Sequence, residues 1–311
     1  MSKASVIIPL YQKAPYIERC LDSVAAQTLA DYEVIVVDDG STDGGGDLVR
    51  ARHDPRLRVI RQENAGEGAA RNRGIAEATG AWVALLDADD EWRPSFLEAT
   101  LEVAVTNQDL VAVFANILDA RSQQPLLQSH GSGLVPDYFD FVMANRGLGM
   151  TSMATLARRD ALQTCGGFRE GVRLGEDHDA FARLAWEGRV AYLAEALAVY
   201  HSGTPGSSMS RARAAMPAFP ETVRSYRERR RAGRIPAQHE RSSQRLANHI
   251  LLDHIASLLN RGDRRSARLF LFHDCEASSW WSVRYWSLIT RLLLPAILHF
   301  RLRSMFGKGD E

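Results

Sequence analysis

Apolar runs alternate with amphipathic stretches over the first 116 residues of the chain. Strand-like runs are expected at residues 5–9, 33–38, 57–61, 82–87 and 111–116, and helix-like stretches at residues 16–27, 44–52, 68–78 and 94–106. Strands and helices that alternate in this way form βαβ units with a largely parallel sheet. The pattern therefore predicts an α/β fold with a Rossmann-like, mostly parallel sheet flanked by helices.

The pattern changes further along the chain. Residues 119–133 are polar and rich in Gln, Ser and Gly, and they predict a loop or a short hairpin. A strand-like run at residues 150–157 follows, and a helix with acidic residues at its amino end opens near residue 174. We expect one domain over residues 1–210 and a basic helical C-terminal extension over residues 211–311, where helix-like stretches carry many arginines.

Charge is divided unevenly between these two regions. The 311-residue chain is formally neutral, and its 45% hydrophobic and 24% charged residues are typical of a globular protein. Residues 1–210 contain 19 Lys and Arg against 29 Asp and Glu, a net charge of −10. Residues 211–311 contain 19 against 9, a net charge of +10. The acidic region carries the candidate chemistry, and the basic region needs another explanation.

Cysteine usage and the amino terminus both bear on location. Cys20, Cys165 and Cys275 are too scattered for a zinc site and too few for a disulfide framework, which favours a reducing compartment. The chain enters a strand-like run at Ala4–Pro9 without the basic flank and apolar stretch of a secretory signal. We therefore predict a cytoplasmic location.

Two of the expected strands end abruptly in acidic residues. The run Val34–Val37 is followed by Asp38 and Asp39, and the run Leu85–Leu86 is followed by the segment Asp87–Asp90. Ligands of open parallel sheets bind outside the carboxyl ends of the strands. The two acidic strand ends therefore predict one shared crevice.

The two acidic strand ends suit different ligands. Asp87 and Asp89, two positions apart, suit a hard divalent cation that is also bound by diphosphate oxygens. The carboxylates of the first end could accept hydrogen bonds from a base or a ribose. The alternative is that Asp39, Ser41 and Asp43 only cap the next helix.

Five short blocks within about the first 110 residues carry a resemblance to a known family. The blocks are Ser5-Val-Ile-Ile-Pro-Leu-Tyr11, Leu21 to Thr28, Asp38-Asp39-Gly-Ser-Thr-Asp43, Asn64 to Gly74, and Asp87-Ala-Asp89. Each block is weak alone, but five blocks in the correct order and spacing are specific together. In this order they resemble the family two glycosyltransferases, whose members have the GT-A fold.

The resemblance implies an enzyme. The GT-A catalytic domain would cover residues 1–210, with a nucleotide-sugar half at about residues 1–117 and an acceptor half at about residues 118–210. The implied reaction moves a sugar from a nucleotide diphosphate donor, by default a uridine diphosphate sugar, to a hydroxyl of a glycan or lipid-linked acceptor. It proceeds with inversion, uses Mg²⁺ or Mn²⁺, and belongs to the assembly of cell-surface polysaccharide or glycoconjugate.

A second interpretation is a non-catalytic sugar-nucleotide-binding or scaffold protein of the same fold. The expected metal ligand Asp89 and the candidate catalytic base Asp177 are both present, which argues against it, because loss of turnover would be expected to spare neither. A nicotinamide-dependent dehydrogenase fits less well, because Gly66 and Gly68 do not form the dinucleotide fingerprint after a strand.

The resemblance also assigns metal ligands. Asp89 is the expected ligand, and Asp87 is expected to contact the metal or the ribose. His201 follows a strand-like run, at a position where similar glycosyltransferases often place a histidine near the metal and the diphosphate. A lone histidine is more often structural, and this alternative stays open for His201.

Four further residues are implied to bind the nucleotide. Pro9 and Tyr11 would line the nucleotide pocket, with Tyr11 stacking on the base. Asp39 would accept the ring N–H of the base, and Arg71 would lie near the base or the phosphates. The alternatives are ordinary packing for Tyr11 and a solvated helix charge for Arg71.

An acidic segment further along supplies the candidate base. In the resembled family a Glu-Asp pair at this place provides the catalytic base, and Asp177 is the matching candidate. For Glu176 and Asp179, capping of the helix amino terminus is an equally good explanation.

The end of the chain combines aromatic and basic residues. Trp280, Trp281 and Trp286 precede an apolar run at residues 292–298. A membrane-spanning helix needs roughly 20 apolar residues, more than this segment offers. The segment could instead lie in the interface of an anionic membrane, or pack on the catalytic domain or on a second subunit of a homo-oligomer. The arginines at residues 224–234 come without a recognition motif, so no nucleic-acid partner is predicted.

Overall fold

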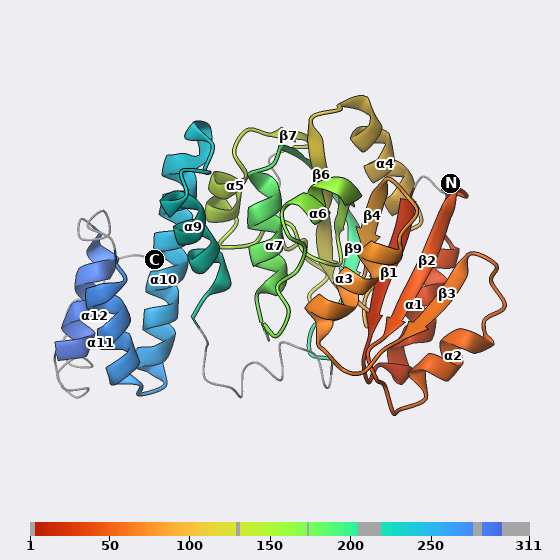
Figure 1. Cartoon of the computed structure of the whole chain (residues 1–311), viewed down its shortest axis with the longest axis horizontal. Helices are drawn as coiled ribbons and strands as arrows, with labels where there is room; N and C mark the ends of the chain where they lie inside the picture. The colour runs from red at the N-terminus through yellow and green to blue at the C-terminus, as the bar shows by residue number, and fades with distance from the viewer. Residues whose placement is uncertain (1–3, 129–130, 173, 205–218, 276–281, 294–311) are drawn as a thin grey trace. The chain divides into compact units, whose positions relative to one another are not determined.

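The chain divides into two compact units, Met1–Ala214 and Ala215–Glu311. The structure is a computed structural model of the 311-residue chain, and it describes residues 4–128, 131–172, 174–204, 219–275 and 282–293. The first unit contains a β-sheet with helices, and the described part of the second unit is helical (Figure 1).

Strands and helices alternate through most of the first unit. Its strands are β1 (Ala4–Leu10), β2 (Tyr32–Asp38), β3 (Leu57–Arg61), β4 (Trp82–Leu85), β5 (Glu91–Trp92), β6 (Leu110–Asp119), β7 (Gly133–Val135), β8 (Thr155–Arg158) and β9 (Arg189–Tyr200). Its helices are α1 (Ala14–Ala25), α2 (Gly45–Ala51), α3 (Glu67–Glu77), α4 (Phe96–Thr106), α5 (Tyr138–Ala144), α6 (Arg159–Thr164) and α7 (Glu176–Ala185). Every strand and helix predicted up to residue 116 has a counterpart in this series.

The strands of the first unit form one sheet in the order β3-β2-β1-β4-β8-β6-β9-β5, and β7 pairs with β9. The neighbours β3, β2, β1 and β4 run parallel, and so do β6 and β9. The strand β8 runs antiparallel between β4 and β6. The predicted α/β fold, with a mostly parallel sheet flanked by helices, is confirmed, and β8 is an antiparallel insertion in it.

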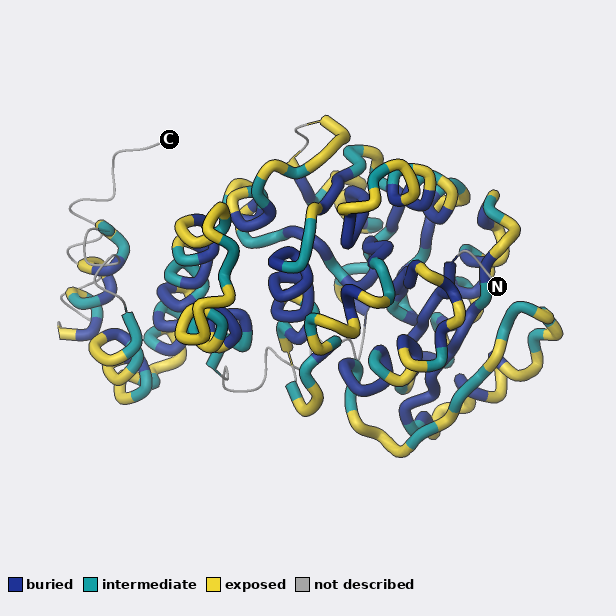
Figure 2. The backbone as a smooth tube through the Cα atoms, turned by 45° about the horizontal axis from the view of Figure 1, so that its top comes forward, coloured by how far each residue is buried: buried dark blue, intermediate teal, exposed yellow. Residues whose placement is uncertain are grey.

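The central strands are buried on both faces, as parallel strands between two layers of helices are. All seven residues of β1 are buried, and the middle of the sheet appears as a continuous buried region in Figure 2. Helix α3 lies close against β1 through Gly74, where an added Cβ atom would lie 2.4 Å from Ile7 Cγ2. The missing side chain of Gly74 therefore allows the helix to approach the strand.

The order of the strands along the sheet reverses at β1, which lies between β2 and β4. The strands β1 and β4 are paired over four residues and then separate. Their last pair is Ile7 with Leu85, and the Leu86 N–H still donates to the Ile7 carbonyl at 3.1 Å. The next residue of β1 on that side is Pro9, which has no N–H to continue the ladder. The sequence predicts a strand up to Asp87, but β4 ends at Leu85 because its pairing with both neighbouring strands stops at that residue.

The described part of the second unit consists of α9 (Glu221–Arg231), the short 3₁₀ helix η1 (Ala237–His239), α10 (Glu240–Asn260), α11 (Arg264–His273) and α12 (Val283–Leu293). Leu251 and Ile255 of α10 form its core with Leu271 of α11 and Leu288 of α12. Trp280, Trp281 and residues 294–303 of the expected interfacial segment lie outside the described residues. No helix in the described part of the chain combines the length and the apolar character needed to cross a membrane.

Candidate active site

Both acidic strand ends lie at the same edge of the sheet, beside the point where the strand order reverses. The Asp39 N–H donates to the Leu10 carbonyl at 2.9 Å, which ties the end of β2 to the end of β1. The segment Asp87–Asp90 leaves β4 on the other side of β1. The topology therefore gathers the candidate residues where open α/β sheets bind ligands.

At the end of β2, the acidic side chains organise the backbone. The Asp39 carboxylate is buried and accepts hydrogen bonds from Gln62 Nε2 at 2.8 Å, from Ala65 N at 2.9 Å and from Gly66 N at 2.8 Å. Asp43 accepts from Ala14 N at 2.8 Å. The residue Asp39 thus holds the loop before α3 in place, and its bond to a nucleotide base stays a prediction.

The end of β4 carries two ion pairs. Asp87 Oδ1 accepts from Arg71 Nη2 at 2.8 Å, and Asp89 Oδ2 lies 2.5 Å from Lys13 Nζ. The side chains of Asp87 and Asp89 remain 32% and 15% exposed. Both carboxylates are therefore paired with protein cations and remain partly exposed.

Arg71 connects the β4 end to the amino end of α7. Its guanidinium is 3% exposed and lies 2.8 Å from Glu176 Oε1, 2.8 Å from Asp87 Oδ1 and 3.6 Å from Glu67 Oε2. It also lies over the ring of Phe168, 5.4 Å from the ring centre. Arg71 is therefore not a solvated helix charge, and its contact with a base or a phosphate stays a prediction.

Burial, followed by the charges of clustered carboxylates, raises several pKa values at the end of β4. Removal from bulk water raises the pKa of Asp87 to about 6, although Arg71 opposes the rise. Burial, and then the charges of Asp87 and Asp89, hold the pKa of Asp90 well above its usual range. Burial and the same three carboxylates raise the pKa of the Cys20 thiol. Several acidic groups thus crowd the end of β4, and their simultaneous ionisation is disfavoured unless a cation is present.

Asp87 and Asp89 would suit a hard divalent cation only together with substrate phosphates, since Mg²⁺ is commonly held by one or two carboxylates and such phosphates. Within the described ranges, no group of three or more His, Cys, Asp or Glu side chains could hold a metal ion. The His201 ring lies 2.7 Å from Glu91 Oε1, and its backbone N–H donates to Asp90 Oδ1 at 2.9 Å. The structure thus brings His201 next to the acidic segment, with its ring on Glu91.

The three acids in the first turn of α7 have different surroundings. Asp179 is fully buried and lies 2.9 Å from Arg183 and 3.2 Å from Arg169, so it is structural. Glu176 is bound to Arg71, and burial raises its pKa. Asp177 is half-buried and accepts from the adjacent His178 N–H at 2.7 Å, and it forms no ion pair among the described residues. Among the described residues, Asp177 is therefore the acid of this turn whose carboxylate has no cationic partner.

Other predicted residues lie on the same edge. Pro9 is buried near the end of β1, and the half-buried Tyr11 follows that strand directly. Their contact with a nucleotide stays a prediction.

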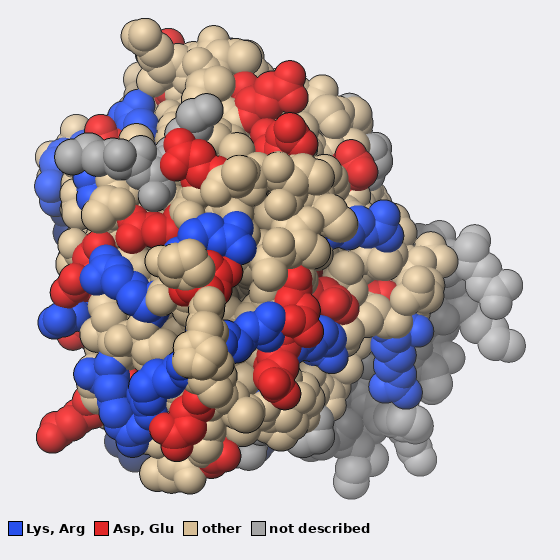
Figure 3. Space-filling model, turned by 90° about the vertical axis from the view of Figure 1, so that its right-hand side faces the viewer, with Lys and Arg blue, Asp and Glu red and all other residues tan. Residues whose placement is uncertain are grey.

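Other ion pairs of the unit, such as that of Arg58 with Glu77, lie outside this site. Lys and Arg side chains are interspersed with Asp and Glu side chains on the face shown in Figure 3.

Sequence reasoning missed two residues that shape this site. Lys13 is 7% exposed, although a lysine is rarely buried without a charged partner. Asn72 clamps the Phe168 backbone, since its Nδ2 donates to the carbonyl at 2.7 Å and its Oδ1 accepts from the N–H at 2.8 Å. The position of Asn72 inside the Asn64–Gly74 block was a signal for its importance, whereas no local pattern identified Lys13.

The known proteins to which this chain is similar include glycosyltransferases. A family model described as Glycosyl transferase family 2 matches residues 5–166, more than half of the chain. The uncharacterized glycosyltransferase alr2836 of Nostoc is 44% identical over 118 residues, which are 37% of this chain and 36% of that protein. The succinoglycan biosynthesis protein ExoO of Rhizobium meliloti is 34% identical over 206 residues, 63% of this chain and 59% of ExoO. The chain spans about a third of the length of several curated relatives, alr2836 among them.

Solved structures share the fold. TarS of S. aureus in complex with UDP-GlcNAc superposes with a TM-score of 0.65 at 22% identity, covering 93% of this chain and 81% of that one. The mannosyltransferase PcManGT of Pyrobaculum calidifontis, in complex with GDP-Man and Mn²⁺, has a TM-score of 0.60 at 21% identity, with 99% and 88% covered. The fold and the acidic edge of the sheet define a GT-A-type α/β protein. The chain belongs to glycosyl transferase family 2, which confirms the resemblance seen in its sequence.

Proposed function

We propose that this chain is a metal-dependent, inverting glycosyltransferase that moves a sugar from a nucleotide diphosphate donor to an acceptor hydroxyl. One observation carries the proposal: Arg71 joins Asp87 at the end of β4 to Glu176, the neighbour of Asp177, although these elements are far apart in the sequence. The proposed donor-binding carboxylates and the proposed base would thus belong to one connected site within the first unit.

The proposed donor is a UDP-sugar. The donor half would use Tyr11 beside the base, Asp39 as the acceptor for the ring N–H, and Pro9 at the pocket wall. The TarS complex with UDP-GlcNAc supports this choice as a structure of the same fold. The sugar itself depends on loops around the pocket and is left open in the proposal.

The proposed cofactor is Mg²⁺ or Mn²⁺. Asp89 and Asp87 would hold it, with His201 as a further ligand, and when bound it would neutralise the charge that develops on the leaving diphosphate. The concentration of carboxylates at the end of β4 supports this part of the proposal, as does the presence of Mn²⁺ in the PcManGT complex.

Asp177 is the proposed general base. An acceptor hydroxyl becomes a competent nucleophile when a carboxylate within hydrogen-bond reach removes its proton during attack. Glu176 is bound to Arg71 and Asp179 to Arg183, so Asp177 is better suited than either to accept this proton. A single base with no covalent enzyme intermediate gives inversion at the anomeric carbon.

The proposed acceptor is a glycan or a lipid-linked glycan in polysaccharide or glycoconjugate assembly, on the cytoplasmic side of the membrane. The name of the relative ExoO, a succinoglycan biosynthesis protein, supports this biological context.

Incubation with a panel of UDP-, GDP- and TDP-sugars tests the proposed reaction. We expect one donor to be consumed with Mn²⁺ and not with EDTA, and Asp89→Asn to lower the rate by at least about 100-fold, because several kcal/mol of charge stabilisation are lost. The control is Asp47→Asn, whose side chain is 81% exposed on α2. Nucleotide binding without consumption of any sugar, in the presence of candidate acceptors, would favour the non-catalytic alternative.

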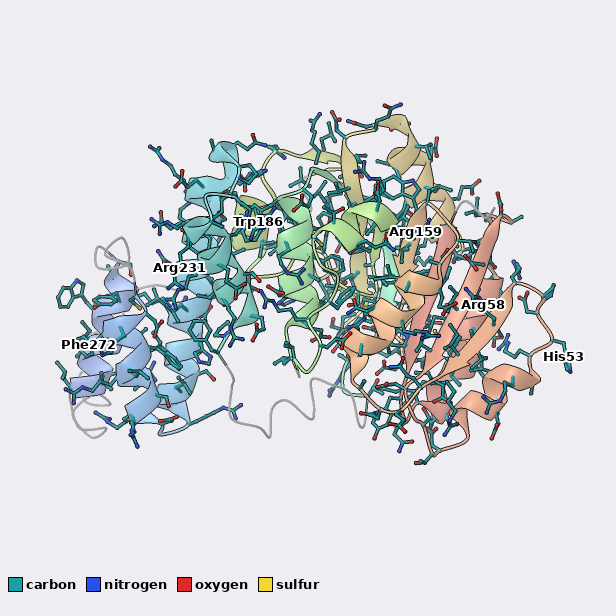
Figure 4. The ribbon with its side chains drawn as sticks, in the orientation of Figure 1. His53, Arg58, Arg159, Trp186, Arg231 and Phe272 are labelled. Atoms are coloured by element: carbon teal, nitrogen blue, oxygen red, sulfur yellow. The ribbon has the colours of Figure 1, made fainter. Side chains whose placement is uncertain are left out.

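For the second unit we propose a peripheral contact with an anionic membrane. Residues 215–311 contain 17 Lys and Arg against 9 Asp and Glu. Large apolar side chains are also exposed on two helices, Phe272 on α11 (Figure 4) and Trp286 on α12, at 51% and 57%. On α12 the buried Leu288 packs into the core of the unit, whereas Trp286 is not among the described residues of that core. Basic charge and exposed aromatic residues together suit a lipid interface.

Sedimentation with vesicles tests the membrane contact. We expect binding to vesicles that contain phosphatidylglycerol, weaker binding to neutral phosphatidylcholine vesicles, and a loss of about tenfold in affinity for the double variant Phe272→Ser and Trp286→Ser, because buried apolar area is removed. The control Val105→Ser removes a side chain that is 65% exposed on α4. Equal binding by the double variant would contradict the assignment, and a changed oligomeric state would point to a second copy of the chain instead.

A further inference from the structure

Lys13 is buried next to a carboxylate that the proposed function assigns to a metal. Its side chain is 9% exposed, and Nζ lies 2.5 Å from Asp89 Oδ2. An ammonium group has three N–H donors, and within the described part of the chain Asp89 is the acceptor that Nζ contacts. The ammonium therefore has donors left for a further anionic partner.

The two carboxylates of the β4 end are held by cations of different kinds. The guanidinium of Arg71 contacts three acids, Asp87, Glu176 and Glu67, and is fixed by them. The ammonium of Lys13 contacts Asp89 alone among the described acids and sits on a flexible four-carbon stem. Loss of the pair with Asp89 therefore requires the movement of one side chain, whereas Arg71 cannot leave Asp87 without also disturbing α7.

The position of Lys13 in the fold determines which anionic groups its ammonium can reach. Lys13 is the residue directly before α1, three residues beyond the end of β1. It therefore lies at the carboxyl edge of the sheet, where the strand order reverses and where the diphosphate of the proposed donor would be bound. If Asp89 held a divalent cation, the Lys13 ammonium would need another acceptor, and the oxygens of a diphosphate bound at this edge could supply one.

We propose that Lys13 is an internal counter-cation that holds Asp89 in the nucleotide-free protein and passes to the diphosphate when a divalent cation takes Asp89. This inference rests on the proposed function. Its consequence is that a metal ion alone binds weakly, because it must displace Lys13 without a new partner for the ammonium. Metal and nucleoside diphosphate then strengthen each other's binding by the same factor.

Titration with Mn²⁺ tests this proposal without any turnover. Free Mn²⁺ is measured by electron paramagnetic resonance with and without UDP, for the wild type and for Lys13→Met. We expect Lys13→Met to bind Mn²⁺ about tenfold more tightly in the absence of UDP, and the gain in Mn²⁺ affinity caused by UDP to fall by about the same factor, within the range of typical coupling energies.

Two further variants separate charge from position. Lys13→Arg keeps the charge and is expected to behave like the wild type. Arg73→Met removes a positive charge from a side chain that is 53% exposed on α3 and is expected to change nothing. If Lys13→Met unfolds in circular dichroism, Lys13→Gln, which keeps a hydrogen-bond donor to Asp89, takes its place.

Mn²⁺ affinity of the Lys13 variant equal to that of the wild type would overturn the counter-cation role. Affinity raised equally by Arg73→Met would do so as well, because a general change of charge would then explain it. Failure of the wild type to bind any nucleotide would instead overturn the proposed function, while the nucleotide-free Mn²⁺ comparison would still decide whether Lys13 competes for Asp89.

Discussion

Replacement of Asp177 by Asn is expected to slow sugar transfer by about 10²- to 10⁴-fold, the usual contribution of a general base, while donor binding is unchanged. The amide cannot take the acceptor proton, but its oxygen can still accept the hydrogen bond from the His178 N–H, which is 2.7 Å long in the native protein. The measurement is kcat with the donor found in the nucleotide-sugar panel, together with the affinity for UDP.

Two neighbouring acids provide the comparison for this result. Asp179→Asn is expected to lower stability, because Asp179 is fully buried with Arg183 and Arg169. Glu176→Gln removes one of the negative charges that hold the Arg71 guanidinium in place. It is expected to reduce kcat less than Asp177→Asn does. Loss of UDP binding by Asp177→Asn would show that Asp177 is a donor ligand, and an unchanged kcat would place the base elsewhere.

Replacement of Arg71 by Met is expected to lower the free energy of unfolding by about 3–5 kcal/mol, the typical cost of removing one partner from a buried ion pair. Asp87 and Glu176 each lie 2.8 Å from the guanidinium and would be left without it. Urea denaturation of the wild type and the variant measures the difference. Arg73→Met is the control, because its exposed pair with Glu77 contributes at most about 1 kcal/mol.

The pH dependence of this loss identifies its cause. Without Arg71 the pKa values of Asp87 and Glu176 rise further in the folded protein, because Arg71 lowers both. A carboxyl group with a raised folded-state pKa destabilises the fold when it is ionised, so the deficit is largest at high pH and shrinks as the pH falls through the raised pKa. A deficit that is the same at pH 8 and pH 5 would point to lost packing against Phe168 instead.

The long central elements were predictable because their patterns are local. The buried strands β1 and β2 contain apolar runs at residues 6–10 and 34–37, and α1 has one buried stripe that includes Ile17, Leu21 and Val24. The short strands β5 and β7 were not predictable. The strand β5 is the pair Glu91–Trp92, and it exists because Val199 and Ala198 of β9 supply its hydrogen-bonding partners. Helix α5, with Tyr138, Phe139 and Phe141 close together, shows no clean helical period.

The candidate site was predictable only in part. The acidic ends of β2 and β4 follow from a strand rule and from the family blocks, so Asp39, Asp87 and Asp89 could be named from the sequence. The contact of Arg71 with Glu176 joins residues 105 positions apart, and that of Lys13 with Asp89 joins residues 76 positions apart. No local pattern encodes either contact.

The sequence by itself determined the order of the long strands and helices up to residue 116, the acidic ends of two strands and the family, because each of these depends on residues that are close along the chain. The tertiary structure decided where β4 stops, which of the acids on α7 lacks an ion-pair partner among the described residues, and that Lys13 and Arg71 neutralise the pair of carboxylates. The physical reason is that burial and ion pairing depend on which distant segments the sheet brings together, and a buried charge persists only where a partner from another segment meets it.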